Sequence, residues 1–463
     1  MRHTGLKLAA LVAAMALGGC SLIPAYQRPE APVPQQWDSP APKVAGGTLA
    51  SWPVFFKDAR LKDLIGQALE NNRDLRVAAL NVEKAQALYR IQRADLLPTI
   101  GATVAGDNQR TPADLSTTGR TQVTHVNSAG IGFTAYELDF FGRVRSLNEE
   151  ALETYLQGVE AQRSAHIALV AEVASAWYQL QADQQLLAIA RQTLASQQAS
   201  YGLVKSSYDN QVSTELDLSQ AESTVRTAQS SQAQYTRQVE QDKNALVLLV
   251  GKPLAPEVFQ AVQGLPAGMD ENLPVGLPSD LLTLRPDIQG AEHALKAANA
   301  DIGAARAAFF PSISLTASAG SASSDLGHLF AGGQGAWSFA PSINLPIFNA
   351  GRNRANLDAA KVQKSIEVAN YQKAIQVAFR EVADGLVAQG TLIDQVNADS
   401  LLVTANMRSY QLADRRYQEG VDTYLNSLDA QRNLFASQQT LVQSQLARLN
   451  NSVSLYKALG GGQ

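Results

Sequence analysis

Residues 417–431 read YQEGVDTYLNSLDAQ, and residues 208–222 read YDNQVSTELDLSQAE. The two stretches align without a gap at an offset of 209 residues. The matched pairs are Tyr208 and Tyr417, Val212 and Val421, Thr214 and Thr423, Leu216 and Leu425, and Ala221 and Ala430. Each stretch has the pattern of a tight turn between two helices. The sequence therefore predicts a duplicated fold with two equivalent helical turns.

The repeat extends outward from these turns over most of the chain. Residues between Asp74 and Pro98 recur 213 positions later between Asp287 and Pro311, and the pair Gly142-Arg143 recurs as Gly351-Arg352. Each repeat is predicted to run helix, strand, strand, long helix, turn, helix. The predicted units are residues 61–250, a linker at 251–286 that holds six prolines, and residues 287–463.

Proline spacing and hydrophobic periodicity locate the elements within each repeat. No proline occurs between Pro112 and Pro253, which predicts a long helix at 142–208 and a returning helix at 213–250. Each long helix would measure on the order of 100 Å at 1.5 Å per residue. The second repeat predicts the counterparts at 351–417 and 421–459. Alternation of apolar and small polar residues predicts strands at 99–107, 128–140, 312–320 and 336–348.

The N-terminal segment indicates export and an anchor. A basic start and an apolar run are followed by small residues and Cys20, the single cysteine of the chain. This pattern predicts a lipoprotein signal peptide at 1–19, lipidation of Cys20 and an extended segment at 20–60 rich in proline. An ordinary signal peptide followed by an incidental cysteine is the alternative.

Composition excludes several classes of function. The net charge is −4 and only 17% of residues are charged, so no basic surface for nucleic acid is expected. One cysteine and five histidines leave few ligands for a metal site. His166 and His293 occur singly, and no catalytic or phosphate-binding motif accompanies them. The sequence predicts neither an enzyme nor a cofactor.

The predicted strands are long enough to cross a bilayer when tilted. Four strands cannot close a barrel, and lipid does not tolerate an open sheet edge. Two chains would supply eight strands, a number that leaves a filled interior, and three would supply twelve with room for a channel. The alternative is a soluble pair of hairpins that caps a helical bundle.

The turns themselves carry recognisable signals. Gly420 can adopt the positive φ that a tight turn between helices requires, and we expect Asn210 to do so in the first copy. Asp422 in the second copy, and Ser213 or Thr214 in the first, are the expected N-caps of the returning helices.

The lipobox, the duplicated unit, the motif at 417–431 and the ending LYKALGGG at 455–462 resemble the outer-membrane factors of tripartite efflux pumps, the TolC/OprM-like family. The resemblance covers essentially the whole mature chain and is strongest to the lipoprotein branch that serves resistance–nodulation–division pumps. It implies a mainly α-helical homotrimer in which a twelve-strand outer-membrane barrel continues into a long periplasmic helical barrel. Its implied partners are a periplasmic adaptor protein, an inner-membrane transporter and outer-membrane lipid.

The same resemblance assigns a periplasmic gate to the second turn. It implies that Leu425 and Asp429, four residues apart on one helix face, form an apolar ring and an acidic ring. Arg416 and Arg415, beside Tyr417, are the expected latch partners, and Asp422 belongs either to the gate or to a helix cap. Where some relatives have a second acid this chain has Asn426, and Gln220 stands at the position equivalent to Asp429.

Three functions fit these features. The first is a passive exit duct for drugs or other small toxic solutes, gated at its helical tips. The second is the duct of a protein secretion system, which would share the fold and differ in cargo. The third is a lipid-anchored coiled-coil scaffold whose hairpins do not enter a membrane.

Overall fold

The computed structural model describes residues 21–37, 49–261, 264–265, 269, 273–274, 276 and 278–462, so the signal peptide and Cys20 lie outside the described residues. The chain forms two compact units, each assembled from three separate segments. Unit 1 comprises Met1–Glu30, Asn81–Val159 and Gly290–Tyr371, and unit 2 comprises Ala31–Leu80, Glu160–Gln289 and Gln372–Gln463. Most of the described chain is helical.

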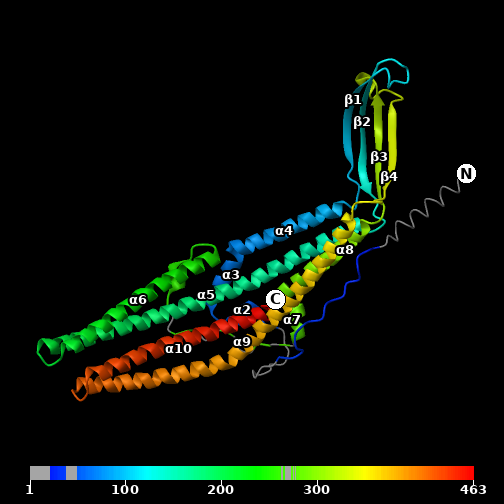
Figure 1. Ribbon diagram of the computed structural model, residues 1–463. Helices are drawn as coiled ribbons and strands as arrows, with labels where there is room; N and C mark the ends of the chain where they lie inside the picture. The colour runs from blue at the N-terminus through cyan, green and yellow to red at the C-terminus, as the bar shows by residue number, and fades with distance from the viewer. Residues whose placement is uncertain are drawn as a thin grey trace. The chain divides into compact units, whose positions relative to one another are not determined.

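Unit 1 contains a four-stranded antiparallel sheet in the order β1-β2-β3-β4 (Figure 1). The strands are β1 (Gly101–Thr111), β2 (Gln122–Glu137), β3 (Ser312–Ser323) and β4 (Gly335–Asn344). The pairing of β2 with β3 joins the two repeats, and β1 and β4 each keep one edge without a partner among the residues that the structure describes.

The strand boundaries differ from those expected. Strands are expected at 99–107 and 128–140, but β1 runs from Gly101 to Thr111 and β2 from Gln122 to Glu137. Val123, Thr124 and Val126 favour extended pairing here despite the polar residues around them. β4 ends at Asn344 instead of residue 348, and Pro346 follows two residues later.

The two faces of the sheet differ in character. Residues paired across strands share a face, and one face collects Trp337 with Ala319, Phe339 with Ala317, and Ile343 with Ile313. Trp337 is 80% exposed, and Phe339 and Ile343 are also exposed. The opposite face carries Ser, Thr and Gly, and Ser318 and Ser338 approach to 2.7 Å through their hydroxyl oxygens. The chain itself therefore leaves one apolar face of this sheet largely uncovered.

Four helices contribute to both units: α4 (Arg73–Ala94), α5 (Arg143–Asp209), α8 (Pro286–Ala307) and α9 (Arg352–Gln418). The helices α5 and α9 have 67 residues each, about 100 Å at 1.5 Å per residue. Unit 1 also contains the 3₁₀ turn η3 (Leu326–His328). No helix in the described part of the chain has both the length and the apolarity needed to cross a membrane.

The other helices belong to unit 2. They are α2 (Trp52–Phe55), α3 (Ala59–Asn71), α6 (Glu215–Val250), α7 (Leu281–Leu284), α10 (Tyr424–Ala458) and the 3₁₀ turns η1 (Pro256–Phe259) and η2 (Pro278–Asp280). Asp58 caps α3 by accepting a hydrogen bond from the amide of Arg60. Asn72 accepts one from the amide of Leu75 at 2.9 Å and thereby caps the start of α4.

The core of unit 2 gathers large aromatic side chains. Phe55 stacks on Tyr456 with ring centroids 4.1 Å apart, and both rings are fully or almost fully buried. The buried Trp177 donates its indole N–H to Asp58 at 3.0 Å, so the residue that caps α3 also fixes α5. This core holds both repeats together, since Tyr456 comes from the second repeat and Trp177 from the first.

A pair of carboxyl groups lies between α5 and α6. Asp183 is buried and accepts a hydrogen bond from the Gln179 amide at 2.8 Å. Asp242 faces Asp183, and its Oδ2 is buried. Burial, followed by hydrogen bonding to Asp183 and repulsion from its charge, raises the pKa of Asp242 to about 7.

We expect Asp242→Asn to raise the Tm of the detergent-solubilised chain at about pH 8 and to leave it unchanged at about pH 4. The folded chain keeps the Asp242 proton while the unfolded chain, with an ordinary pKa of about 4, releases it. Wild-type stability therefore falls as the pH rises from about 4 through about 7. Circular dichroism measures the transition. Asp384→Asn, at an exposed carboxylate of α9, is the control and should show no such pH-dependent gain.

Candidate functional site at the helical tips

The two helical turns have the same backbone design. In the second, Gly420 has a φ of 72°, and the Val421 amide donates to the Arg416 carbonyl at 2.9 Å. In the first, Gln211 has a φ of 60°, and the Val212 amide donates to the Ser207 carbonyl at 2.8 Å. This six-to-one bond across a left-handed residue ends a helix and reverses the chain.

The expectation that Asn210 takes the left-handed position is wrong. At the offset of 209 residues Gly420 corresponds to Gln211, and the structure places Gln211 there. Asn210 instead donates its side-chain amide to the Ser206 carbonyl at 2.7 Å and caps the last turn of α5. The first turn thus holds a non-glycine residue in a conformation that costs about 1 kcal/mol.

The helices that leave the turns begin differently. Thr214 is the N-cap of α6 and forms a capping box with Asp217: the Asp217 amide donates to the Thr214 hydroxyl at 3.2 Å, and the Thr214 amide donates to the Asp217 carboxylate at 3.1 Å. Hydrogen bonds from Thr214 lower the pKa of Asp217, and the bond from the Thr214 side chain contributes most. In the second copy Thr423 is the N-cap of α10, and its side chain makes no capping bond.

The prediction that Asp422 is the N-cap is therefore wrong by one residue. Asp422 precedes the cap and accepts hydrogen bonds from the Thr423 amide at 2.9 Å and from Asn426 at 2.6 Å. In the first copy the equivalent positions hold Ser213 and Asp217, 3.1 Å apart. The acid therefore comes first in the second copy, as Asp422 with Asn426, and second in the first copy, as Asp217 with Ser213.

Arg416 binds within its own turn. Its Nε donates to Asp422 Oδ2 at 3.2 Å, and this ion pair spans the turn around Gly420. Hydrogen bonds lower the pKa of Asp422, the largest contribution coming from the Thr423 amide, followed by Asn426 and Arg416. Within one chain, Arg416 thus pairs with Asp422.

One face of α10 fixes the second tip against the first. Tyr424 and Leu428 are buried, and they pack with Val204 of α5 and Ala221 of α6 in one cluster. Partly buried Tyr201, Leu218 and Tyr417 surround this cluster, and the rings of Tyr417 and Tyr424 lie 5.4 Å apart. Figure 1 shows the two turns side by side at one end of these helices. The two hairpins therefore form a single packed tip.

Polar contacts continue this interface along the helices. Gln431 of α10 donates to the Ser196 hydroxyl of α5 at 2.9 Å, and Ser196 lies 3.1 Å from the Tyr410 hydroxyl of α9. Burial, with smaller contributions from Asp217 and Asp414, raises the pKa of Tyr417, so this phenol stays neutral. Tyr417 therefore acts in packing at the tip.

The other face of α10 points away from this contact. Leu425 is 47% exposed, and the side chain of Asp429, one turn later, is 57% exposed. Asp429 pairs with Arg432 at 3.6 Å, three residues along the same helix. Leu425 and Asp429 thus share an exposed face, as their spacing predicts, and the cation beside Asp429 is Arg432.

Two of these features follow from residue spacing alone, although they were not predicted from the sequence. The pattern Thr214-x-x-Asp217 is a capping box with Asp at its fourth position, and Asp429-x-x-Arg432 has the spacing of a helical ion pair. The pairing of Arg416 with Asp422 crosses the turn and depends on its folded geometry. Cys20, the remaining candidate site residue, lies outside the described residues.

We expect Gln211→Gly to slow amide hydrogen exchange at residues 208–216 about fivefold, because glycine removes about 1 kcal/mol of left-handed strain. Gly420→Gln should accelerate exchange across the second turn by a similar factor. Asn210→Gly is the matched control, since it loses the bond to Ser206 and relieves no strain. Equal protection in wild type and Gln211→Gly would contradict this account of the turn.

Comparisons with known proteins place this architecture in a family. A family model described as outer membrane efflux protein matches residues 64–252 and 277–461. The chain is 54% identical over 461 residues to the toluene efflux pump outer membrane protein TtgC of Pseudomonas putida, covering 98% of this chain and 95% of that protein. It is 44% identical over 464 residues to outer membrane protein OprJ of Pseudomonas aeruginosa, covering 100% of this chain and 97% of that protein.

Solved structures agree with the sequence comparisons. The crystal structure of a membrane protein from Pseudomonas aeruginosa matches with a TM-score of 0.90 and 44% identity, covering 95% of this chain and 100% of that one. The matched family model spans both repeats, including both tips. The chain therefore belongs to the outer membrane efflux protein family.

Proposed function

We propose that three copies of this chain form the outer-membrane exit channel of a tripartite efflux pump. The observation that carries this proposal is the four-stranded sheet of unit 1, with its uncovered apolar face and its two unpartnered edges. The channel is passive and needs no cofactor. A periplasmic adaptor protein and an inner-membrane resistance–nodulation–division transporter supply its cargo.

Edge closure argues for association of chains. The free edges of β1 and β4 expose backbone groups that lipid cannot satisfy, so each edge needs a strand from another chain. Pairing β4 of one chain with β1 of the next closes a barrel, and three chains give twelve strands around a channel. The face with Trp337, Phe339 and Ile343 then meets lipid, and the Ser, Thr and Gly face lines the lumen.

The cargo follows from the relatives and from this lumen. Relatives include proteins named as outer membrane components of toluene and antibiotic efflux pumps. A lumen face of small hydroxyl side chains offers no selective pocket for one solute. We assign the chain to export of small toxic solutes and drugs, with the choice among them made by the transporter.

The exposed face of α10 forms the proposed gate. Three copies of Leu425 and Asp429, brought together around one axis, make an apolar constriction and an acidic ring. Asp422, Arg416 and Gly420 hold the turn that carries this face, and Tyr417 packs it on the first hairpin. Opening moves the second tip outward and separates the rings, and the adaptor docks on these tips.

We expect the double variant Leu425→Ala with Asp429→Ala to raise single-channel conductance in planar lipid bilayers, because it removes both constriction rings. Leu216→Ala with Gln220→Ala changes the equivalent residues of the first turn and is the matched control. The control should conduct as the wild type does. An unchanged conductance in the Leu425 and Asp429 variant would reject this gate.

The anchor at Cys20 is a separate proposal that rests on the sequence pattern before it. We expect cells grown with radiolabelled palmitate to label the wild-type chain, and Cys20→Ser to abolish the label because it removes the acylated thiol. Gel electrophoresis and autoradiography of the purified chain measure the incorporated label. Label retained in Cys20→Ser would contradict lipidation at this position.

A further inference from the structure

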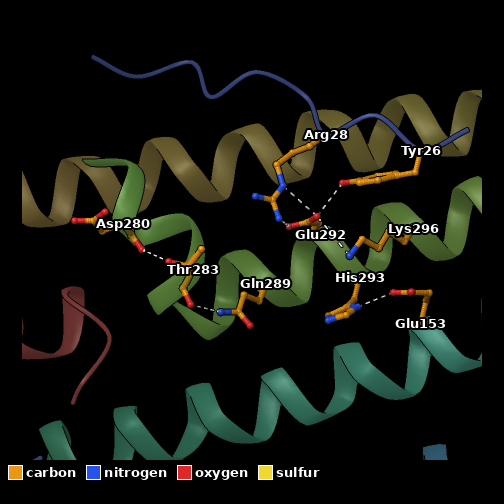
Figure 2. A network of polar contacts seen from close by, with 9 residues as sticks. All are labelled: Tyr26, Arg28, Glu153, Asp280, Thr283, Gln289, Glu292, His293 and Lys296. Atoms are coloured by element: carbon orange, nitrogen blue, oxygen red, sulfur yellow. Dashed lines mark hydrogen bonds and ion pairs between the residues drawn. The ribbon is translucent and has the colours of Figure 1, made fainter. Parts of the chain in front are cut away.

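Residues 22–28 of unit 1 run extended along α8, in the opposite direction to the helix. The Arg306 guanidinium donates to the Leu22 carbonyl at 3.1 Å, and the Asn299 amide donates to the Pro24 carbonyl at 2.8 Å. At the other end, Tyr26 donates to Glu292 at 3.2 Å (Figure 2). We call residues 22–28 the strap.

The contacts on α8 follow a single stripe. They involve Glu292, Lys296, Asn299, Gly303 and Arg306, which are spaced by four, three, four and three residues. This spacing keeps all five on one face of a helix. The stripe is about 21 Å long at 1.5 Å per residue, and the six steps of an extended strap cover about 20 Å. The strap and the stripe therefore match in length.

Glu292 is the most specific point of the stripe. Its side chain is only 7% exposed, and Arg28 donates to both of its oxygens, at 3.2 and 2.7 Å (Figure 2). Lys296 lies 3.5 Å from the same carboxylate and 5.5 Å from the centre of the Tyr26 ring. Burial alone would raise the pKa of Glu292, but the bonds from Arg28, Lys296 and Tyr26 lower it. A buried carboxylate of this kind requires its partner.

Gly303 provides the space for the strap at its other end. A Cβ at this position would lie 2.6 Å from Cγ1 and 3.0 Å from the backbone nitrogen of Ile23. Any larger side chain would displace the strap backbone. The α8 stripe thus offers a hydrogen-bond donor at Arg306, space for a backbone at Gly303 and a buried carboxylate at Glu292. These three features are spaced as one extended peptide requires.

We propose that this stripe of α8 is a built docking site for an extended peptide, and that residues 22–28 are its permanent occupant whether or not a lipid is attached. Arg306 lies near the end of α8, and β3 begins six residues later at Ser312. The strap therefore brings the N-terminal end of the described chain to the sheet end of α8. Insofar as Cys20 carries a lipid, which rests on the proposed function, the strap fixes the height of the sheet relative to the membrane surface.

The test measures the mobility of a nitroxide attached to Ala25→Cys in a Cys20→Ser background. Ala25 is exposed, and Cys20 is the only native cysteine, so the label is unique and the lipid is absent. We expect an immobilised spectrum in this background and loss of the immobilised component in Arg28→Glu. Arg28→Glu with Glu292→Arg should restore it, because the swapped charges can pair again.

Arg163→Glu is the matched control. It breaks the pair with Glu160 in unit 2, whose two side chains are 52% and 8% exposed against 48% and 7% for Arg28 and Glu292. The Arg163→Glu variant should keep the nitroxide label immobilised. Circular dichroism monitors folding of every variant, and Arg28→Glu carries the test alone if the swapped pair does not fold, since it leaves α8 unchanged.

Two results would overturn the proposal: a mobile label in the unlipidated parent, or an immobilised label in Arg28→Glu. Both readings are made in detergent and depend on neither conductance nor acylation. Failure of the channel or of the lipid anchor would leave the spectra as expected, so the two proposals fail separately.

Discussion

The open edges of the sheet are the constraint on which the rest of this molecule depends. A strand that crosses lipid must satisfy all its backbone groups, and the described residues of one chain supply four strands. The exit channel that we propose therefore has to be an assembly of several chains. The side chains agree with this, since the apolar face of the sheet is too exposed for a folded monomer in water.

Duplication placed two hairpins at one tip and then allowed them to diverge. The first keeps a capping box and tolerates Gln211 in a left-handed conformation, whereas the second has Gly420 and moves its acid to Asp422. A capping box stabilises the start of α6, and α10 lacks a side-chain cap at Thr423. The hairpin with the weaker helix start is the one that carries Leu425 and Asp429. The gate that we propose therefore lies on the hairpin whose returning helix has no side-chain cap.

Much of this fold could be predicted because the repeat gives every element twice. The proline-free stretches located both long helices, and the alternating segments located all four strands. Strand ends were less predictable, because residues 108–111 and 122–127 are mostly polar but still pair once a neighbouring strand is present. Asparagine commonly adopts positive φ, which favours Asn210 in the sequence, but the geometry of the turn places Gln211 at the left-handed position.

The candidate site was predicted unevenly for a physical reason. Helical spacing placed Leu425 and Asp429 on a common face, since that depends only on local geometry. The partner of Arg416 and the packing of Tyr424 on Val204 depend on contacts across a turn or between hairpins. Local periodicity carries no information about such contacts. The docking of the strap on α8 was invisible for the same reason, because its partners are more than 260 residues apart.

That separation also sets an order of events during biogenesis. The N-terminus is the first part of the chain to be made and exported, but the strap contacts α8, which follows 264 to 284 residues later. The strap therefore has no docking site until most of the polypeptide has been translocated. Any enzyme that processes the N-terminus encounters it before it is docked. Docking therefore requires that α8, the first helix of the second repeat, has arrived.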